Sequence, residues 1–164
     1  MNRRNFVRVA TSSAGGLMLA FHLPGCSKTN LPGNTGLPTE INAWLVIDPD
    51  NSVTVRVAKA EMGEGIFTSL PMIVAEELGV DWDQVKTEYA DANRNLKEDS
   101  VYGNMNTGGS RSVRVGRPAL QLAGATAREQ LIKAAAMRWE TDPKHCVASG
   151  GKVSWNGKSL NYGE

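Results

Sequence analysis

Two short segments that place glycines directly before a predicted helix constrain this chain more than any other feature. The first covers residues 58–70 and carries Gly63 and Gly65; the second covers residues 107–112 and reads Thr-Gly-Gly-Ser-Arg-Ser. Glycine lacks a Cβ, so a ligand can approach its backbone closely and a positive φ costs little. A helix start adds free N–H groups and the positive end of the helix dipole. Together the segments predict a cradle that holds one anionic ligand from two sides.

The same glycines also fit a simpler interpretation. Gly63 and Gly65 can serve only to turn the chain, and Gly108 and Gly109 can form a flexible loop before a helix. Short glycine motifs often arise without any ligand, so their spacing alone leaves both interpretations open.

The composition and charge of the chain limit the classes of protein to which it can belong. The chain has 164 residues, of which 41% are hydrophobic and 21% charged, as expected for one globular domain. The net charge is +1, and three of the basic residues, Arg3, Arg4 and Arg8, lie within the first eight residues, so the remainder is slightly acidic. A nucleic-acid-binding domain normally presents a basic face, so we expect no nucleic-acid partner.

Residues 1–26 have the features of an export signal. Residues 3–8 read Arg-Arg-Asn-Phe-Val-Arg, which resembles a twin-arginine signal. The apolar run from Val9 to Phe21 is too short and interrupted for a transmembrane helix. We therefore expect export by the twin-arginine route to the periplasm or its membrane surface, with a poor ordinary secretory signal as the alternative.

The cysteines and histidines are few. Cys26 lies in a stretch that loosely resembles a lipoprotein cleavage box, although an uncleaved stretch of small residues fits equally well. The other cysteine, Cys146, has no intrachain partner if the signal is removed before Cys26. His22 and His145 are too few and too scattered for a protein-ligated zinc site, so we expect no protein-bound metal.

The folded part is expected to begin near Ile41, after a linker at residues 27–40 that is rich in Gly, Pro, Asn and Thr. Residues 43–47 and 52–59 predict two strands, joined by a hairpin turn at residues 48–51. In the second strand Val53, Val55 and Val57 alternate with polar or small residues, which predicts one buried face.

Helices and further strands follow in alternation. We predict a helix capped by Ser69 and ended by Gly79, a strand at residues 85–89, and an irregular segment at residues 91–106. A long helix over residues 110–139 has an apolar stripe of small residues, typical of close packing against a sheet. A hairpin at residues 146–155 ends the series. This order predicts an α+β fold in which helices pack on one face of a mixed sheet.

At this point several stretches together resemble a known family. From Asn42 to Glu164 the chain resembles the N-terminal part of molybdopterin-binding large subunits of the xanthine dehydrogenase family, and especially the isoquinoline 1-oxidoreductase beta-subunit group. The resemblance rests on residues 60–65, 70–78, 81–82, 107–112 and 123–128, which occur in the expected order. It identifies residues 41–164 as a partial molybdopterin-binding domain, truncated at its C-terminus.

The resemblance implies a molybdenum hydroxylase that acts on an N-heterocycle or an aldehyde and takes the inserted oxygen from water. It implies molybdenum on a pterin, in the cytosine dinucleotide form, and a small partner subunit with two-iron, two-sulfur clusters; a c-type cytochrome is a further expected acceptor. The cofactor-binding residues that it implies lie in the two glycine segments: Gly63, Glu64, Gly65, Thr68, Thr107, Gly108, Gly109, Ser110 and Ser112.

Some positions depart from the family pattern. Glu64 stands where the family usually has Gln, and an ionised carboxylate can accept hydrogen bonds but cannot donate them. Glu64 must therefore be protonated, face a donor, or point away from the cofactor. Asn106 stands near a position where a Gln is expected, so contacts there differ.

The family's catalytic glutamate and a later glycine-rich loop do not occur in this sequence. We therefore assign no catalytic residue and expect the fragment alone to be inactive; Glu61, beside the first loop, is interpreted as structural. Two alternatives from other classes are a small exported binding protein for a phosphate-bearing ligand, with or without a lipid on Cys26, and a structural remnant that binds nothing.

Overall fold

The computed structural model describes residues 37–164. The expected export signal at residues 1–26 and the linker as far as residue 36 lie outside the described residues. Within residues 37–164, no helix combines the length and the apolar character needed to cross a membrane.

A four-stranded mixed sheet forms the first layer. Its strands are β1 (Thr39–Asn42), β2 (Leu45–Ile47), β3 (Val53–Val57) and β4 (Val85–Tyr89), in the order β1-β2-β3-β4. The first three strands are antiparallel and β4 pairs parallel to β3. Val53, Val55 and Val57 are all buried, which confirms the predicted alternation in β3.

The strand β1 corrects the predicted end of the linker. Thr39 and Glu40 were expected to be irregular, but they pair with Ile47 and Val46 of β2. The reason lies in distant residues: both carboxylate oxygens of Glu40 accept hydrogen bonds from the guanidinium groups of Arg56 and Arg94. A pattern read along the sequence does not show such a contact.

Helix α2 (Ile66–Leu78) connects β3 to β4 and packs on these strands. Its buried residues include Ile66, Leu70, Val74 and Leu78, which recur every four positions and so share one face. The helix ends at Gly79, which has φ +75° and donates its N–H to the Ala75 carbonyl, as predicted.

The start of α2 was predicted wrongly. Ser69 does not cap the helix, because the helix already begins at Ile66, and Ser69 and Pro71 both lie inside it. Gly65, with φ +79°, is the N-cap residue and has no side chain to offer. The first turn instead finds its acceptor in Glu61, outside the helix, so the usual cap signal is absent from the sequence.

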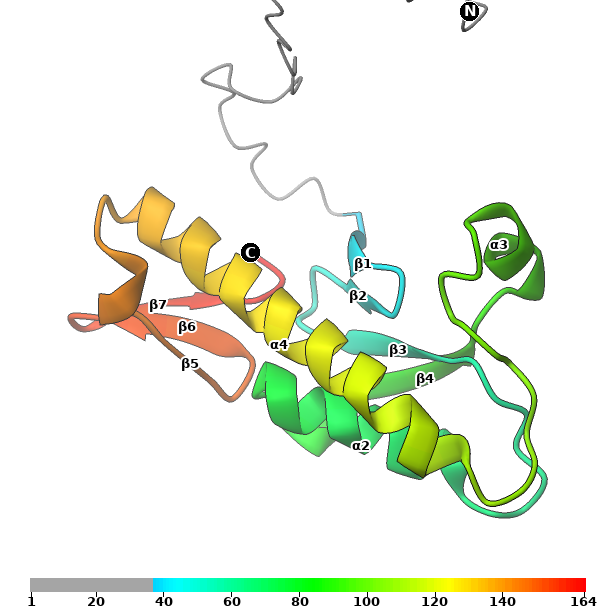
Figure 1. The fold of residues 1–164 in the computed structure, drawn as a ribbon. Helices are drawn as coiled ribbons and strands as arrows, with labels where there is room; N and C mark the ends of the chain where they lie inside the picture. The colour runs from blue at the N-terminus through cyan, green and yellow to red at the C-terminus, as the bar shows by residue number, and fades with distance from the viewer. Residues whose placement is uncertain (1–36) are drawn as a thin grey trace, which may run out of the picture. The chain divides into compact units, whose positions relative to one another are not determined.

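Helix α4 (Ser112–Arg138) lies against α2, as Figure 1 shows. A Cβ on Gly124 would lie 2.8 Å from the Val74 carbonyl oxygen and 2.9 Å from the Cβ of Glu77. Only glycine therefore fits at this contact. The small-residue stripe does serve close packing, but its main partner is helix α2 rather than the sheet.

The C-terminal segment forms a separate antiparallel sheet of β5 (Val147–Ser149), β6 (Lys152–Trp155) and β7 (Lys158–Asn161), in that order. The β5–β6 hairpin agrees with the prediction, whereas β7 was not predicted. This sheet is joined to α2 by the buried hydroxyl of Tyr162, which donates to the Leu78 carbonyl at 2.8 Å. Burial raises the pKa of Tyr162 to about 12.

Short helices occupy the connections: η1 (Trp82–Gln84), η2 (Pro143–His145) and α3 (Ala92–Lys97). The last one corrects the prediction that residues 91–106 are irregular. Asp91 caps α3 by accepting the N–H of Asn93, and the Asn95 carboxamide then receives the N–H of Tyr102. Polar side chains thus order this segment through local hydrogen bonds.

Candidate functional site

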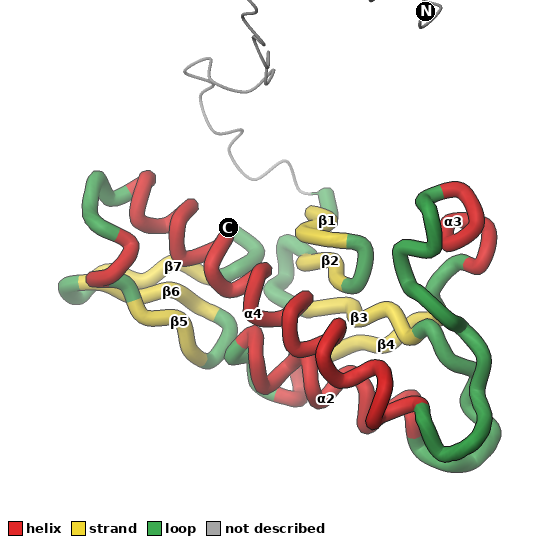
Figure 2. Tube along the Cα trace, viewed as in Figure 1, coloured by secondary structure: helices red, strands yellow, loops and turns green. Residues whose placement is uncertain are grey.

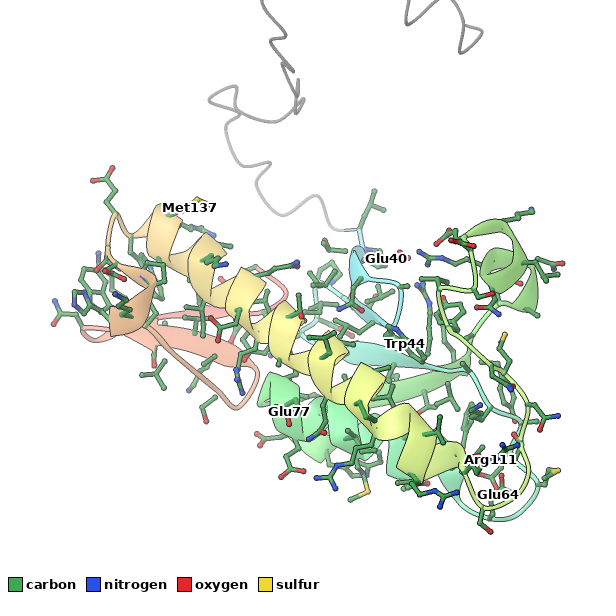
Figure 3. All side chains as sticks on the ribbon, viewed as in Figure 1. Glu40, Trp44, Glu64, Glu77, Arg111 and Met137 are labelled. Atoms are coloured by element: carbon green, nitrogen blue, oxygen red, sulfur yellow. The ribbon has the colours of Figure 1, made fainter. Side chains whose placement is uncertain are left out.

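The two glycine segments lie side by side, at the same end of the sheet and helices (Figure 2). The Thr107 hydroxyl donates to the Ala60 carbonyl at 3.0 Å, and the Lys59 ammonium donates to the carbonyls of Asn104 and, at 3.0 Å, Asn106. Figure 3 shows Glu64 and Arg111, one from each segment, at this common end. We call residues 58–65 the first glycine loop and residues 104–111 the second glycine loop.

The first glycine loop has an open backbone. Gly63 and Gly65 have φ values of +100° and +79°, which L-residues with side chains rarely adopt. No atom lies within 4 Å of the position that a Cβ would take at either residue. The two glycines are therefore required by conformation and leave space outside the loop. Thr68 lies in the exposed first turn of the helix that follows.

Glu61 binds the amino end of α2. Its Oε1 accepts the N–H groups of Gly63 at 2.7 Å and Gly65 at 2.9 Å, and its Oε2 accepts that of Phe67 at 2.9 Å. These backbone hydrogen bonds, led by the one from Phe67, lower the pKa of Glu61, so the carboxylate is ionised at neutral pH. This is the structural role that the sequence suggested for Glu61.

Glu64 also faces its own loop. Its Oε2 accepts the N–H of Met62 at 2.8 Å, so the carboxylate has a backbone donor within two residues.

The second glycine loop leads into α4 with a different pattern. Gly109 and Ser110 have φ values of +62° and +52°, and the N-cap residue Arg111 makes no side-chain cap. Among the described residues, the N–H groups of Ser112, Val113 and Arg114 find no acceptor. The amino end of α4 therefore presents free donors.

The charges around this second helix start are basic. The first turn of α4 contains no acidic residue, and Arg111, Arg114 and Arg117 are all exposed. Basic side chains at a helix amino end oppose the dipole and destabilise an isolated helix. A bound anion would offset this cost, so the donor set fits an anionic group. These arginines were not among the predicted site residues, although their position before and within a helix start is readable from the sequence.

A cavity of about 220 Å³ lies beside the second loop. Its lining includes Trp44 and Tyr102, together with Lys59 and Ser112. The rings of Trp44 and Tyr102 pack edge to face, with 5.2 Å between their centroids. Ser112, predicted as a cofactor-binding residue, is thus largely buried at the cavity wall rather than exposed in the loop. The structure brings the other seven loop residues and Thr68 to the neighbouring surface.

An ion-pair network holds the segment that leads to the second loop. Glu40 contacts Arg94 of α3 at 2.7 Å and Arg56 of β3 at 2.8 Å. Hydrogen bonds from Arg94 and then Arg56 lower the pKa of Glu40 to about 2. Arg94 also pairs with Glu98 at 2.9 Å.

The described residues offer no metal-binding cluster of three or more His, Cys, Asp or Glu side chains. Cys146 is a free, buried thiol whose pKa is raised by burial, and Cys26 lies outside the described residues. What the site presents is glycine backbone, free N–H groups and arginines, which suits a phosphate-bearing organic group.

Comparison with known proteins agrees with this chemistry. Residues 4–164 match the molybdopterin cofactor-binding domain family, and the chain belongs to that family. The resemblance to molybdopterin-binding large subunits is thereby confirmed.

Two curated relatives show the same relationship. The chain is 33% identical over 168 residues to the membrane-bound aldehyde dehydrogenase [pyrroloquinoline-quinone] of Gluconacetobacter polyoxogenes, covering all of this chain and 21% of that protein. It is 34% identical over 131 residues to isoquinoline 1-oxidoreductase subunit beta of Brevundimonas diminuta, covering 75% of this chain and 16% of that protein. The chain thus spans about a fifth or less of these relatives.

A solved structure supports the fold. Quinoline 2-oxidoreductase from Pseudomonas putida 86 superposes with a TM-score of 0.55 at 25% identity, covering 73% of this chain and 15% of that one. The predicted fold class, an α+β fragment of a larger molybdopterin-binding domain, is confirmed.

Proposed function

We propose that this chain supplies two cofactor-binding loops to the large subunit of an exported molybdenum hydroxylase. The observation that carries the proposal is the basic, uncapped amino end of α4 beside two glycine loops that contact each other. Membership in the molybdopterin cofactor-binding domain family supports the identity of the ligand. The bound molybdenum cofactor would supply the oxidation chemistry, with water as the oxygen source.

The residues of this chain would bind and orient that cofactor. The free N–H groups of Ser112 and Val113 would donate to its phosphate oxygens, and Gly109 would allow close approach of the backbone. Lys59 would fix the spacing of the two loops through its bonds to the second loop. We assign no catalytic residue to this chain, so the isolated 164-residue chain should be inactive and retain little cofactor.

The finer parts of the proposal concern the whole enzyme. An N-heterocycle or aldehyde substrate is supported by the names of the isoquinoline and aldehyde relatives. The cofactor in its cytosine dinucleotide form, a two-iron, two-sulfur partner subunit and a c-type cytochrome acceptor belong to the same proposal through the family resemblance.

Export by the twin-arginine route is proposed from Arg3 and Arg4, with the mature protein in the periplasm or at its membrane. Replacing both arginines with Lys should leave a full-length precursor in the cytoplasm. Unchanged appearance of the double variant in the periplasm would refute the route.

The cofactor role is tested by Gly109→Val in the holoenzyme that carries this chain. Gly109 has φ +62°, and a Val side chain there would be strained and would block close approach. We expect loss of most bound molybdenum and pterin. Glu76→Ala, on the exposed face of α2, is the matched control and should retain both.

Both variants would be compared at equal thermal stability, by metal analysis and pterin fluorescence. Equal cofactor content in the two proteins would mean that the second glycine loop is only a connector. A phosphate-bearing ligand other than molybdopterin in the purified protein would favour the small binding protein instead.

A further inference from the structure

The carboxylate of Glu61 uses both oxygens on the backbone around the start of α2. Oε1 accepts hydrogen bonds from the N–H groups of Gly63 and Gly65, and Oε2 accepts one from the N–H of Phe67, each with an N–O distance of at most 2.9 Å. Hydrogen bonds from N–H groups to an ionised acceptor are stronger than those to a neutral one. The chain therefore places a negative charge of its own where the helix dipole is positive.

We infer that Glu61 is a positioning residue that acts as a built-in anion at the amino end of α2, so that this helix start is closed to the anionic groups of any ligand. Glu61 holds the first glycine loop in its curved, positive-φ conformation. The loop then offers shape and open space to a ligand, but not the N–H groups of Met62, Gly63 and Gly65.

The neighbouring donors support this assignment. The N–H of Met62 is taken by Glu64, and those of Thr68 and Ser69 donate to the Gly65 carbonyl. An external phosphate at this position would therefore meet few free donors and two carboxylates, which repel it. The occupied N–H groups distinguish this helix start from that of α4.

The consequence for the cofactor rests on the proposed function. If this chain binds molybdopterin as proposed, the phosphate groups lie toward the second glycine loop, and the first loop contacts an uncharged part. The role of Glu61 itself can be measured without any cofactor.

The test uses backbone amide exchange, followed by NMR, in the 164-residue chain. In Glu61→Ala the amides of Gly63, Gly65 and Phe67 should exchange at least about tenfold faster, because each loses a bond to a charged acceptor. Added acetate should restore their protection, whereas chloride at the same ionic strength should not. Glu76→Gln, an exposed carboxylate on the same helix, is the control and should change nothing.

Glu61→Gln provides a second variant if the alanine protein does not fold. Glutamine is neutral and has one acceptor oxygen where glutamate has two, so at least one of the two, the Gly63 and Gly65 pair or Phe67, should lose protection. Unchanged exchange at all three amides in Glu61→Gln would overturn the inference, and so would failure of acetate to protect folded Glu61→Ala. Neither result would alter cofactor content in the Gly109→Val experiment, so the two proposals can fail separately.

Discussion

The helices α2 and α4 begin in the same way in the sequence and in different ways in space. Each follows glycines with positive φ, and each lacks a side-chain cap from its own N-cap residue. At α2 the N–H groups of Gly65 and Phe67 are bound by the carboxylate of Glu61, whereas at α4 the N–H groups of Ser112, Val113 and Arg114 have no acceptor among the described residues. Exposed arginines lie at the amino end of α4, whereas the carboxylates of Glu61 and Glu64 lie at the amino end of α2.

This difference shows that a glycine loop before a helix does not by itself make an anion site. Positive φ gives the loop its shape, but the free donors decide whether an anion can bind. One charged side chain upstream of the helix is enough to remove them. The two loops of this site therefore have different roles. The first glycine loop shapes the site, and the second glycine loop with the start of α4 offers the donors.

The largest effect is expected at the contact between α2 and α4, because this contact orients the two helices and therefore the amino ends of both. Gly124→Val should destabilise the chain by about 2–3 kcal/mol, since its Cβ would lie within 3 Å of the α2 backbone. Urea unfolding measures the loss.

Gly116→Ala is the matched control on the same helix. Its Cβ would meet only the Leu120 side chain at 3.9 Å, an ordinary contact. The change should be neutral or stabilising by up to about 1 kcal/mol. Equal destabilisation by the two substitutions would show that helix α4 does not depend on close approach at Gly124.

A smaller effect is expected from Glu40, whose ion pairs join β1 to β3 and to α3. Its folded-state pKa is lowered from the usual 4.5 to about 2, so its stabilisation is complete above pH 4.5 and is lost as pH falls toward 2. The Glu40 side chain is 41% exposed, so solvent screening reduces the gain to about 1 kcal/mol.

Unfolding of the wild type and Glu40→Gln at pH 7 and at pH 2.5 tests this. The difference between the two proteins should be present at pH 7 and should shrink at pH 2.5. Glu88→Gln, which removes one of the ion pairs of Arg56, should cost less at pH 7. A difference that is independent of pH would exclude the ion pairs as its source.

Local patterns predicted much of the fold. The alternating valines of β3, the hairpin turn before it and Gly79 at the end of α2 each act through neighbouring residues, so they are readable. Long-range contacts account for the errors. The strand β1 depends on arginines from β3 and α3, and α2 begins early because Glu61 is an acceptor outside the helix.

The site was predicted in outline for the same reason. Glycine spacing and family resemblance indicated both loops, and the bond from Thr107 to Ala60 brings them together. The sequence could not show that one helix start is occupied and the other free, because this depends on which way Glu61 points. The arginines near the amino end of α4 are readable in the sequence and oppose the helix dipole, but they were not predicted as part of the site.

The comparison is tested most directly by titrating the 164-residue chain with inorganic pyrophosphate and following backbone amide shifts by NMR. We predict that the amides of Gly109, Ser110, Ser112 and Val113 shift in a saturable way, while those of Gly63, Gly65 and Phe67 do not move. Shifts confined to the amides of Gly63, Gly65 and Phe67 would contradict the assignment of the free donors to α4. The absence of a saturable shift in both sets of amides would also contradict it.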